Sequence, residues 1–107
     1  LAMSDTPHRE AIEQLEALGL SAYAARTFVG LVKLESGTAK TVSETVDVHR
    51  TRVYDAVEEL TELGLVTVDE TTPKRFRSVP AETACDLFER EYMEQISELR
   101  ESLDALE

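Results

Sequence analysis

The spacing of the apolar residues changes abruptly at Gly64, and this change constrains the fold more than any other feature of the sequence. Over 49–63 the apolar positions recur every three or four residues, as on one face of an α-helix. Over 65–69, and again over 74–79, apolar and polar residues alternate, with turn-forming residues between the two stretches. We therefore expect a helix that is followed at once by a β-hairpin.

Three shorter helices are expected upstream. The first begins at His8 and stops at Gly19, while Ser21 and Thr38 cap the second and the third. Only two residues separate the third helix from the one that begins near His49. This pair is expected to form a helix-turn-helix, and the hairpin that follows it is a wing.

A last helix is expected from Pro80 to the end of the chain, since proline suits the entry to a helix. Its apolar residues recur in steps of four, three, four and three, which is typical of a coiled-coil seam. These residues are Tyr92, Ile96, Leu99, Leu103 and Leu106. The helix is about 39 Å long at 1.5 Å per residue, too long for one small domain to cover. We expect two copies of the chain to bury the seam as a homodimer.

The composition excludes several classes of protein. The 107 residues, 42% of them hydrophobic, are enough for one domain with a core. No stretch approaches the 18 or so apolar residues of a membrane span, and no secretory leader is present, so we expect a soluble cytoplasmic protein without a membrane partner. The single cysteine, Cys85, forms neither an internal disulfide nor a thiolate metal cluster.

The net charge is −11, from 22 acidic and 11 basic residues. Affinity for a phosphate backbone comes largely from Lys and Arg, so the total charge alone disfavours nucleic acid as a partner. The acids are unevenly placed, however, because 82–107 holds nine of them against two arginines. Such an acidic, lysine-poor surface is tolerated where salt screens its self-repulsion, and we predict a halophilic source.

Basic residues gather at two places despite this excess of acid. The first turns of the fourth helix carry side chains suited to the major groove, where Arg bonds guanine and Thr touches a thymine methyl. The candidates there are His49, Arg50, Thr51, Arg52 and Tyr54. Thr51, Asp55, Glu58 and Glu62 point away from the core on a helical wheel. The acids Glu58, Glu59 and Glu62 lie later on the helix, where it would leave the groove, and they limit how deeply it docks.

The second wing strand supplies the other basic group. Arg75 and Arg77 share one face of the strand, and Phe76 points to the opposite face, toward the core. Together with Lys74 nearer the tip, the two arginines are placed to contact phosphate or a minor groove. A plainer alternative is that these cations only balance Asp69 and Glu70. For His49 and Tyr54, helix capping and packing on the wing are equally open alternatives to base contact.

Several short motifs occur in a characteristic order over about residues 10–90. They are Leu18-Gly19-Leu20-Ser21, Tyr23-Ala24-Ala25-Arg26, Thr38-Ala39, Arg50-Thr51-Arg52-Val53-Tyr54-Asp55, Leu63-Gly64-Leu65-Val66, Pro73-Lys74-Arg75-Phe76-Arg77 and Val79-Pro80. Together they resemble the winged-helix domain of TrmB-like archaeal transcriptional regulators. The resemblance implies a dimeric regulator of double-stranded DNA, with Arg50, Thr51, Arg52 and Tyr54 on its recognition helix and Lys74, Arg75 and Arg77 on its wing.

The chain departs from this family at three points. Asp47 stands where such domains often have Gly, although Asp tolerates a left-handed conformation, and His49 stands where Pro or Ser is frequent. Larger members carry a C-terminal sugar-binding domain, whereas this sequence ends on the coiled-coil helix. It is either a short regulator or a piece of a longer one. No effector site is therefore transferred, and a small-molecule effector stays unknown.

Two other classes of function are weighed against the regulator. An enzyme is disfavoured because Cys85, His8 and His49 have no partner spacing for catalysis and no glycine-rich phosphate loop occurs, so we assign no catalytic residue, metal or cofactor. A protein-interaction module without DNA binding is the alternative that the net charge favours. We take the acidic residues of 82–107 as the solvated face of a dimer helix rather than a mimic of DNA.

The predicted fold class is mainly α with a small β-hairpin (α+β), a winged helix-turn-helix with a long C-terminal dimerisation helix. We expect a cloning remnant and polar lead-in over 1–7, the DNA-binding winged helix over 8–80, and the coiled-coil helix over 81–107.

The charge also predicts how stability responds to salt. The Debye length falls from about 10 Å at 0.1 M to about 3 Å at 1 M, which weakens repulsion among the acids. The melting temperature should therefore rise with potassium chloride over this range in a calorimetric or circular-dichroism melt. A flat or falling curve would contradict the prediction of a halophilic protein.

Overall fold

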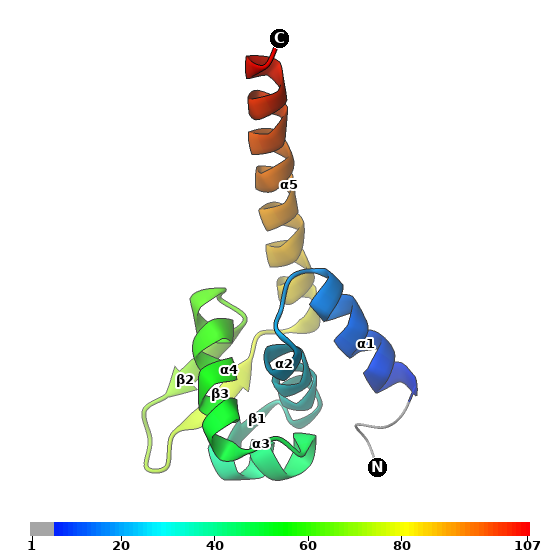
Figure 1. Cartoon of the computed structure of the whole chain (residues 1–107). Helices are drawn as coiled ribbons and strands as arrows, with labels where there is room; N and C mark the ends of the chain where they lie inside the picture. The colour runs from blue at the N-terminus through cyan, green and yellow to red at the C-terminus, as the bar shows by residue number, and fades with distance from the viewer. Residues whose placement is uncertain (1–5) are drawn as a thin grey trace.

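The computed structural model describes residues 6–107 and shows a winged helix-turn-helix body from which one long helix projects (Figure 1). The elements are α1 (Thr6–Ala17), α2 (Ala22–Leu34), β1 (Ser36–Thr38), α3 (Ala39–Val46), α4 (Arg50–Glu62), β2 (Val66–Asp69), β3 (Arg75–Ser78) and α5 (Ala81–Ala105). The predicted mainly α fold with a β-hairpin is confirmed. The first helix begins two residues before its predicted start at His8, and the predicted cloning remnant lies outside the described residues.

The helix caps follow the predicted chemistry. The Ser21 hydroxyl accepts a hydrogen bond from the Ala24 backbone N–H, and the Thr38 hydroxyl accepts one from the Thr41 N–H. Each cap satisfies one of the backbone donors that a helix N-terminus leaves unpaired. The starts of α2 and α3 are thereby fixed by the sequence.

Helix α2 lies at the centre of the body. It contacts α1, α3, α4, β1 and β3, and seven of its residues from Ala24 to Leu31 are buried. Their side chains meet those of the other elements in one hydrophobic core, which includes Phe28, Leu31, Val42, Val46, Val53, Leu60, Leu65 and Phe76. The helix-turn-helix and the wing are therefore both mounted on α2.

The sheet has one strand more than the predicted hairpin. The hairpin of β2 and β3 is present, and β1 pairs with the other edge of β3 to give the order β1-β3-β2. Gly37 lies opposite Phe76 in this antiparallel pairing. A three-residue stretch of Ser, Gly and Thr has no alternation of apolar and polar residues, so its strand depends on the partner rather than on a local pattern.

Helix α5 packs on the body only through its first turns. Ala84 is buried, Leu87 and Phe88 are half-buried, and the Tyr92 hydroxyl donates to the Ala17 carbonyl oxygen at 3.4 Å. Farther along, the apolar side chains of the predicted seam are exposed in the single chain. Figure 1 shows this part of α5 standing clear of the body. Within residues 6–107 no helix is both long and apolar enough to span a membrane.

The packing of α2 on α3 yields a stability prediction. A methyl group added at Gly30 would overlap the Val46 side chain, and overpacking of this kind costs about 1–3 kcal/mol. Gly30→Ala should therefore lower the free energy of unfolding in urea titrations. In a Val46→Ala background the same change should cost much less, since the obstructing methyl groups are gone and alanine favours the helix. Equal costs in both backgrounds would contradict the proposed overlap.

Candidate nucleic-acid interface

The turn between α3 and α4 determines where α4 begins. Asp47 adopts a left-handed conformation with φ 54°, as the sequence allowed. The Ser43 hydroxyl donates to the Val48 carbonyl oxygen at 2.6 Å, and the Val48 N–H donates back to the Ser43 carbonyl at 3.2 Å. Arg26 of α2 donates to the Val46 carbonyl oxygen at 2.6 Å. A cation at this helix C-terminus also complements the helix dipole, so the turn is held both by its own hydrogen bonds and by α2.

His49 is the N-cap of α4. Its ring Nδ1 accepts a hydrogen bond from the Thr51 backbone N–H at 3.2 Å. An accepting Nδ1 requires that the hydrogen of the neutral ring sits on Nε2. Of the two interpretations left open for His49, the structure shows the capping role, which leaves Nε2 free to donate.

Side chains on both flanks of α4 are engaged by neighbouring elements. On one flank the Arg52 guanidinium lies 5.3 Å from the centre of the Tyr23 ring, a cation–π contact with α2. On the other, the Tyr54 ring meets the Phe76 ring of the wing edge-on at 6.1 Å. Packing on the wing, the alternative to base contact for Tyr54, is therefore present, although half of this side chain stays exposed.

Glu59 has a role that sequence reasoning missed. Its carboxylate accepts hydrogen bonds from the Ser21 backbone N–H at 3.0 Å and from the Ser21 hydroxyl at 2.8 Å. A carboxylate is favourable at the N-terminus of a helix, here α2. In the sequence, Glu59 lies seven residues after Arg52 and therefore on the same flank of α4. Its partner on α2 could be identified only from the folded structure.

The outward face of α4 agrees with the helical wheel. An outward strip of four exposed side chains runs along the helix, made of Thr51, Asp55, Glu58 and Glu62. The buried side chains on the opposite face are Val53, Ala56, Val57 and Leu60. Arg50, at the start of the helix, is also exposed, and its side chain makes no hydrogen bond or ion pair within residues 6–107. The first two turns of α4 therefore present Arg50, Thr51 and Asp55 to solvent.

The cations of the wing lie where the sequence predicted, but each of them also has a partner within the chain. Phe76 is buried and anchors β3 on the core, while Arg75 and Arg77 are exposed. Arg77 lies 3.3 Å from Asp69 and Lys74 lies 3.6 Å from Glu70, which are the pairs of the plainer alternative. Arg75 donates instead to the Ser36 hydroxyl at 3.1 Å. Exposed pairs of this kind contribute about 0–1 kcal/mol, so exchanging a carboxylate for a phosphate costs little.

The two basic groups lie at the same end of the molecule. The Tyr54–Phe76 contact joins α4 directly to the wing strand. In Figure 1 the start of α4 and the loop between β2 and β3 both lie away from the tip of α5. The acidic half of α5 and the basic candidates thus occupy opposite ends of the chain.

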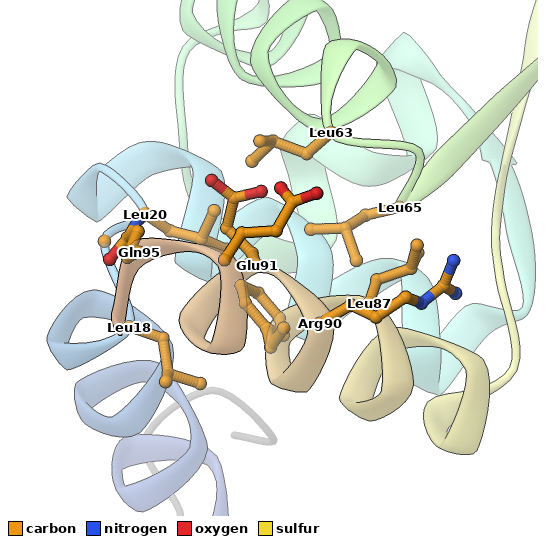
Figure 2. Close-up of a pocket in the computed structure, with 11 residues that line it drawn as sticks. Leu18, Leu20, Leu63, Leu65, Leu87, Arg90, Glu91 and Gln95 are labelled. Carbon is orange, nitrogen blue, oxygen red and sulfur yellow. The ribbon is translucent and has the colours of Figure 1, made fainter. Parts of the chain in front are cut away.

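A separate hollow of about 390 Å³ lies where α5 leaves the body (Figure 2). Leucines from the α1–α2 turn, from the end of α4 and from α5 form its walls, including Leu18, Leu63 and Leu87. Arg90, Glu91 and Gln95 of α5 line the hollow as well. Its lining contains neither histidine nor cysteine, and residues 6–107 hold no cluster of side chains suited to a metal ion.

The helix-turn-helix on α2, the sheet order β1-β3-β2 and the projecting α5 together define a winged helix-turn-helix fold. The comparison with protein families is more specific. Residues 15–82 match the model of the family described as sugar-specific transcriptional regulator TrmB. The chain belongs to the TrmB family, as the resemblance implied.

A curated relative agrees with this assignment. The sugar-sensing transcriptional regulator TrmBL1 of Pyrococcus furiosus is 25% identical over 97 residues, which make up 91% of this chain and 28% of the relative. The chain thus spans little more than a quarter of the length of this relative. The family and this homologue are transcriptional regulators rather than enzymes.

Solved structures agree on the fold. TrmBL2, described as an archaeal chromatin protein with a novel mode of DNA binding, matches 92% of this chain and 39% of its own, with TM-score 0.84 and 22% identity. A possible transcriptional regulator from Methanosarcina mazei Go1 matches with TM-score 0.72 and 11% identity, over 94% of this chain and 89% of its own. A MarR-family regulator from Silicibacter pomeroyi matches with TM-score 0.60 and 23% identity, over 92% of this chain and 64% of its own.

Proposed function

We propose that this chain is a sequence-specific, double-stranded DNA-binding transcriptional regulator that acts as a homodimer. The start of α4 enters the major groove, and the wing contacts the backbone or the minor groove. The observation that carries the proposal is the joining of α4 to the wing at Tyr54 and Phe76, because it puts the exposed Arg50 and the wing arginines at one end of the molecule. Such a regulator works in the cytoplasm, where prokaryotic DNA lies.

The geometry of α4 supports docking by its N-terminal turns. The His49 cap leaves its Nε2 available as a donor to a phosphate, and Arg50 is exposed with no competing partner in the described part of the chain. Arg52 must leave the Tyr23 ring to reach a base, which costs about 0.5–1 kcal/mol at an exposed site. A bidentate contact with guanine is worth about 1–3 kcal/mol and outweighs that cost.

The distribution of charge on α5 supports the homodimer. The residues beside the seam are Met93, Gln95, Arg100, Ser102 and Glu107, and the one acid among them is Glu107, the last residue of the sequence. Glu94, Glu98, Glu101 and Asp104 fall on the opposite side of the helix, as three-to-four-residue spacing requires. Two helices can therefore pair along the exposed leucines without bringing these four acids together. The pairing gives two recognition helices, as a two-fold symmetric operator requires.

A protein-interaction module is the second candidate, and the outward strip of α4 favours it. Asp55, Glu58 and Glu62 repel phosphate, and none of the three forms an ion pair within residues 6–107. This candidate predicts no binding to any duplex at any salt concentration. The proposed regulator must instead dock on DNA through the first turns of α4.

The two sets of arginines should behave differently when removed. Arg50→Ala or Arg52→Ala should cost about 1–3 kcal/mol on the preferred duplex and relax discrimination there, because base contacts carry sequence information. Arg75→Ala or Arg77→Ala should weaken binding to all duplexes about equally and reduce the salt slope by about one per lost phosphate contact. Fluorescence anisotropy over a series of salt concentrations measures both effects.

Arg9→Ala is the matched control for these variants, since it removes one positive charge from α1 without touching α4 or the wing. It should leave sequence preference unchanged. If Arg50→Ala and Arg52→Ala behave like this control, the proposed docking in the groove is wrong and the interaction module is favoured.

Dimerisation should depend on the distal part of α5. Burying apolar side chains of this size is worth about 1.5–3 kcal/mol each, and a chain that ends at Glu91 lacks the whole seam. Analytical ultracentrifugation should find the full chain dimeric and the shortened chain monomeric. A shortened chain that stays equally dimeric would place the interface elsewhere.

A further inference from the structure

We infer that Asp55 reads an exocyclic amino group of the DNA, cytosine N4, and thereby sets the base preference of this chain at one position. The inference rests on the proposed function, because it assigns a role within the same docking of α4. Among the acids of the outward strip, Asp55 lies nearest the helix start, one turn after Thr51.

The position of Asp55 on α4 makes it face any groove that the helix enters. Thr51 and Asp55 are four residues apart and both exposed, whereas Val53 and Val57, two residues to either side of Asp55, are buried. Side chains four apart lie one above the other on the same face of a helix. An Asp side chain is short, so it reaches base edges only from the centre of the outward face, and Asp55 lies there.

The cations near Asp55 in sequence do not neutralise it. Arg52, one turn earlier, holds its guanidinium over the Tyr23 ring of α2. Asp55 forms no ion pair within residues 6–107. The carboxylate therefore enters the groove with its charge intact.

A charged carboxylate in the major groove discriminates strongly among the bases. Guanine and thymine offer carbonyl oxygens, which repel it, whereas the amino group of cytosine donates a hydrogen bond to it. Adenine also offers an amino group, but its N7 acceptor lies beside it and repels a carboxylate, so cytosine N4 is the partner that the chemistry favours. Replacing the cytosine by thymine exchanges a donor for an acceptor at the same place, and this exchange should be the most costly for binding.

Glu58 and Glu62 do not take the same role. They lie about 4.5 Å and 10.5 Å farther along the helix axis than Asp55, at 1.5 Å per residue. The helix leaves the groove in that direction, because its N-terminal turns dock first. Their effect is a general repulsion of phosphate, without preference for any base. Glu58 is therefore a matched control: a neighbouring exposed acid on the same strip.

The test is a selection of bound sequences from randomised duplexes, followed by competition binding on the selected site. It uses the full chain and its Asp55→Asn, Asp55→Ala and Glu58→Gln variants. For the full chain we expect a conserved cytosine whose change to thymine weakens binding about tenfold or more. Asp55→Asn should convert that one position to adenine, since an Asn amide bonds adenine N6 and N7 together. Asp55→Ala should reduce the cytosine-to-thymine ratio to less than about threefold.

The control and the contrary outcomes separate this inference from the proposed function. Glu58→Gln should tighten binding to all duplexes and leave the selected sequence unchanged. If Asp55→Asn and Asp55→Ala select the same sequence as the full chain, the role of Asp55 is overturned while regulation through DNA stands. If the full chain selects no sequence at all, both the inference and the sequence-specific function are contradicted. Asp55 is exposed, so circular dichroism should show all variants folded alike.

Discussion

The placement of α4 depends on the close approach of α2 to the end of α3. Gly30 leaves room for the Val46 side chain, and Arg26, one turn earlier on α2, bonds the carbonyl oxygen of the same valine. The left-handed Asp47 then reverses the chain and starts α4 at a fixed angle. Because α2 also carries the wing through the core contacts of Phe76, one helix sets the relative positions of both candidate DNA-contacting elements.

The sequence predicted those features that have a local cause. The change of period at Gly64, the caps at Ser21 and Thr38, and the inward-facing Phe76 all follow from spacing or from side-chain chemistry, and all are present. Strand β1 was not predicted, because its hydrogen bonds come from β3 across a long stretch of chain. The contacts of Arg52 with Tyr23 and of Glu59 with Ser21 were missed for the same reason. A sequence pattern gives the face of a helix but not the neighbour that covers it.

The strong negative charge is compatible with DNA binding because of where it lies. Much of it is carried by α5, whose tip stands clear of the body, while the basic candidates lie at the far end (Figure 1). Of the acids of α4 itself, Glu59 accepts hydrogen bonds from the start of α2, and the others lie on the outward strip. The proposed interface therefore depends on a few placed cations rather than on a basic surface. Affinity should then come from shape and base contacts more than from bulk electrostatics.

The most direct test of this account is a nuclear magnetic resonance titration of the isotope-labelled chain with duplex DNA. The account predicts that amide shifts gather at the start of α4, over 49–55, and in the wing, over 74–77, while the distal half of α5 stays unchanged. Shifts centred instead on the outer face of α1 or on α5, or no shifts at saturating duplex in either low or molar salt, would contradict it.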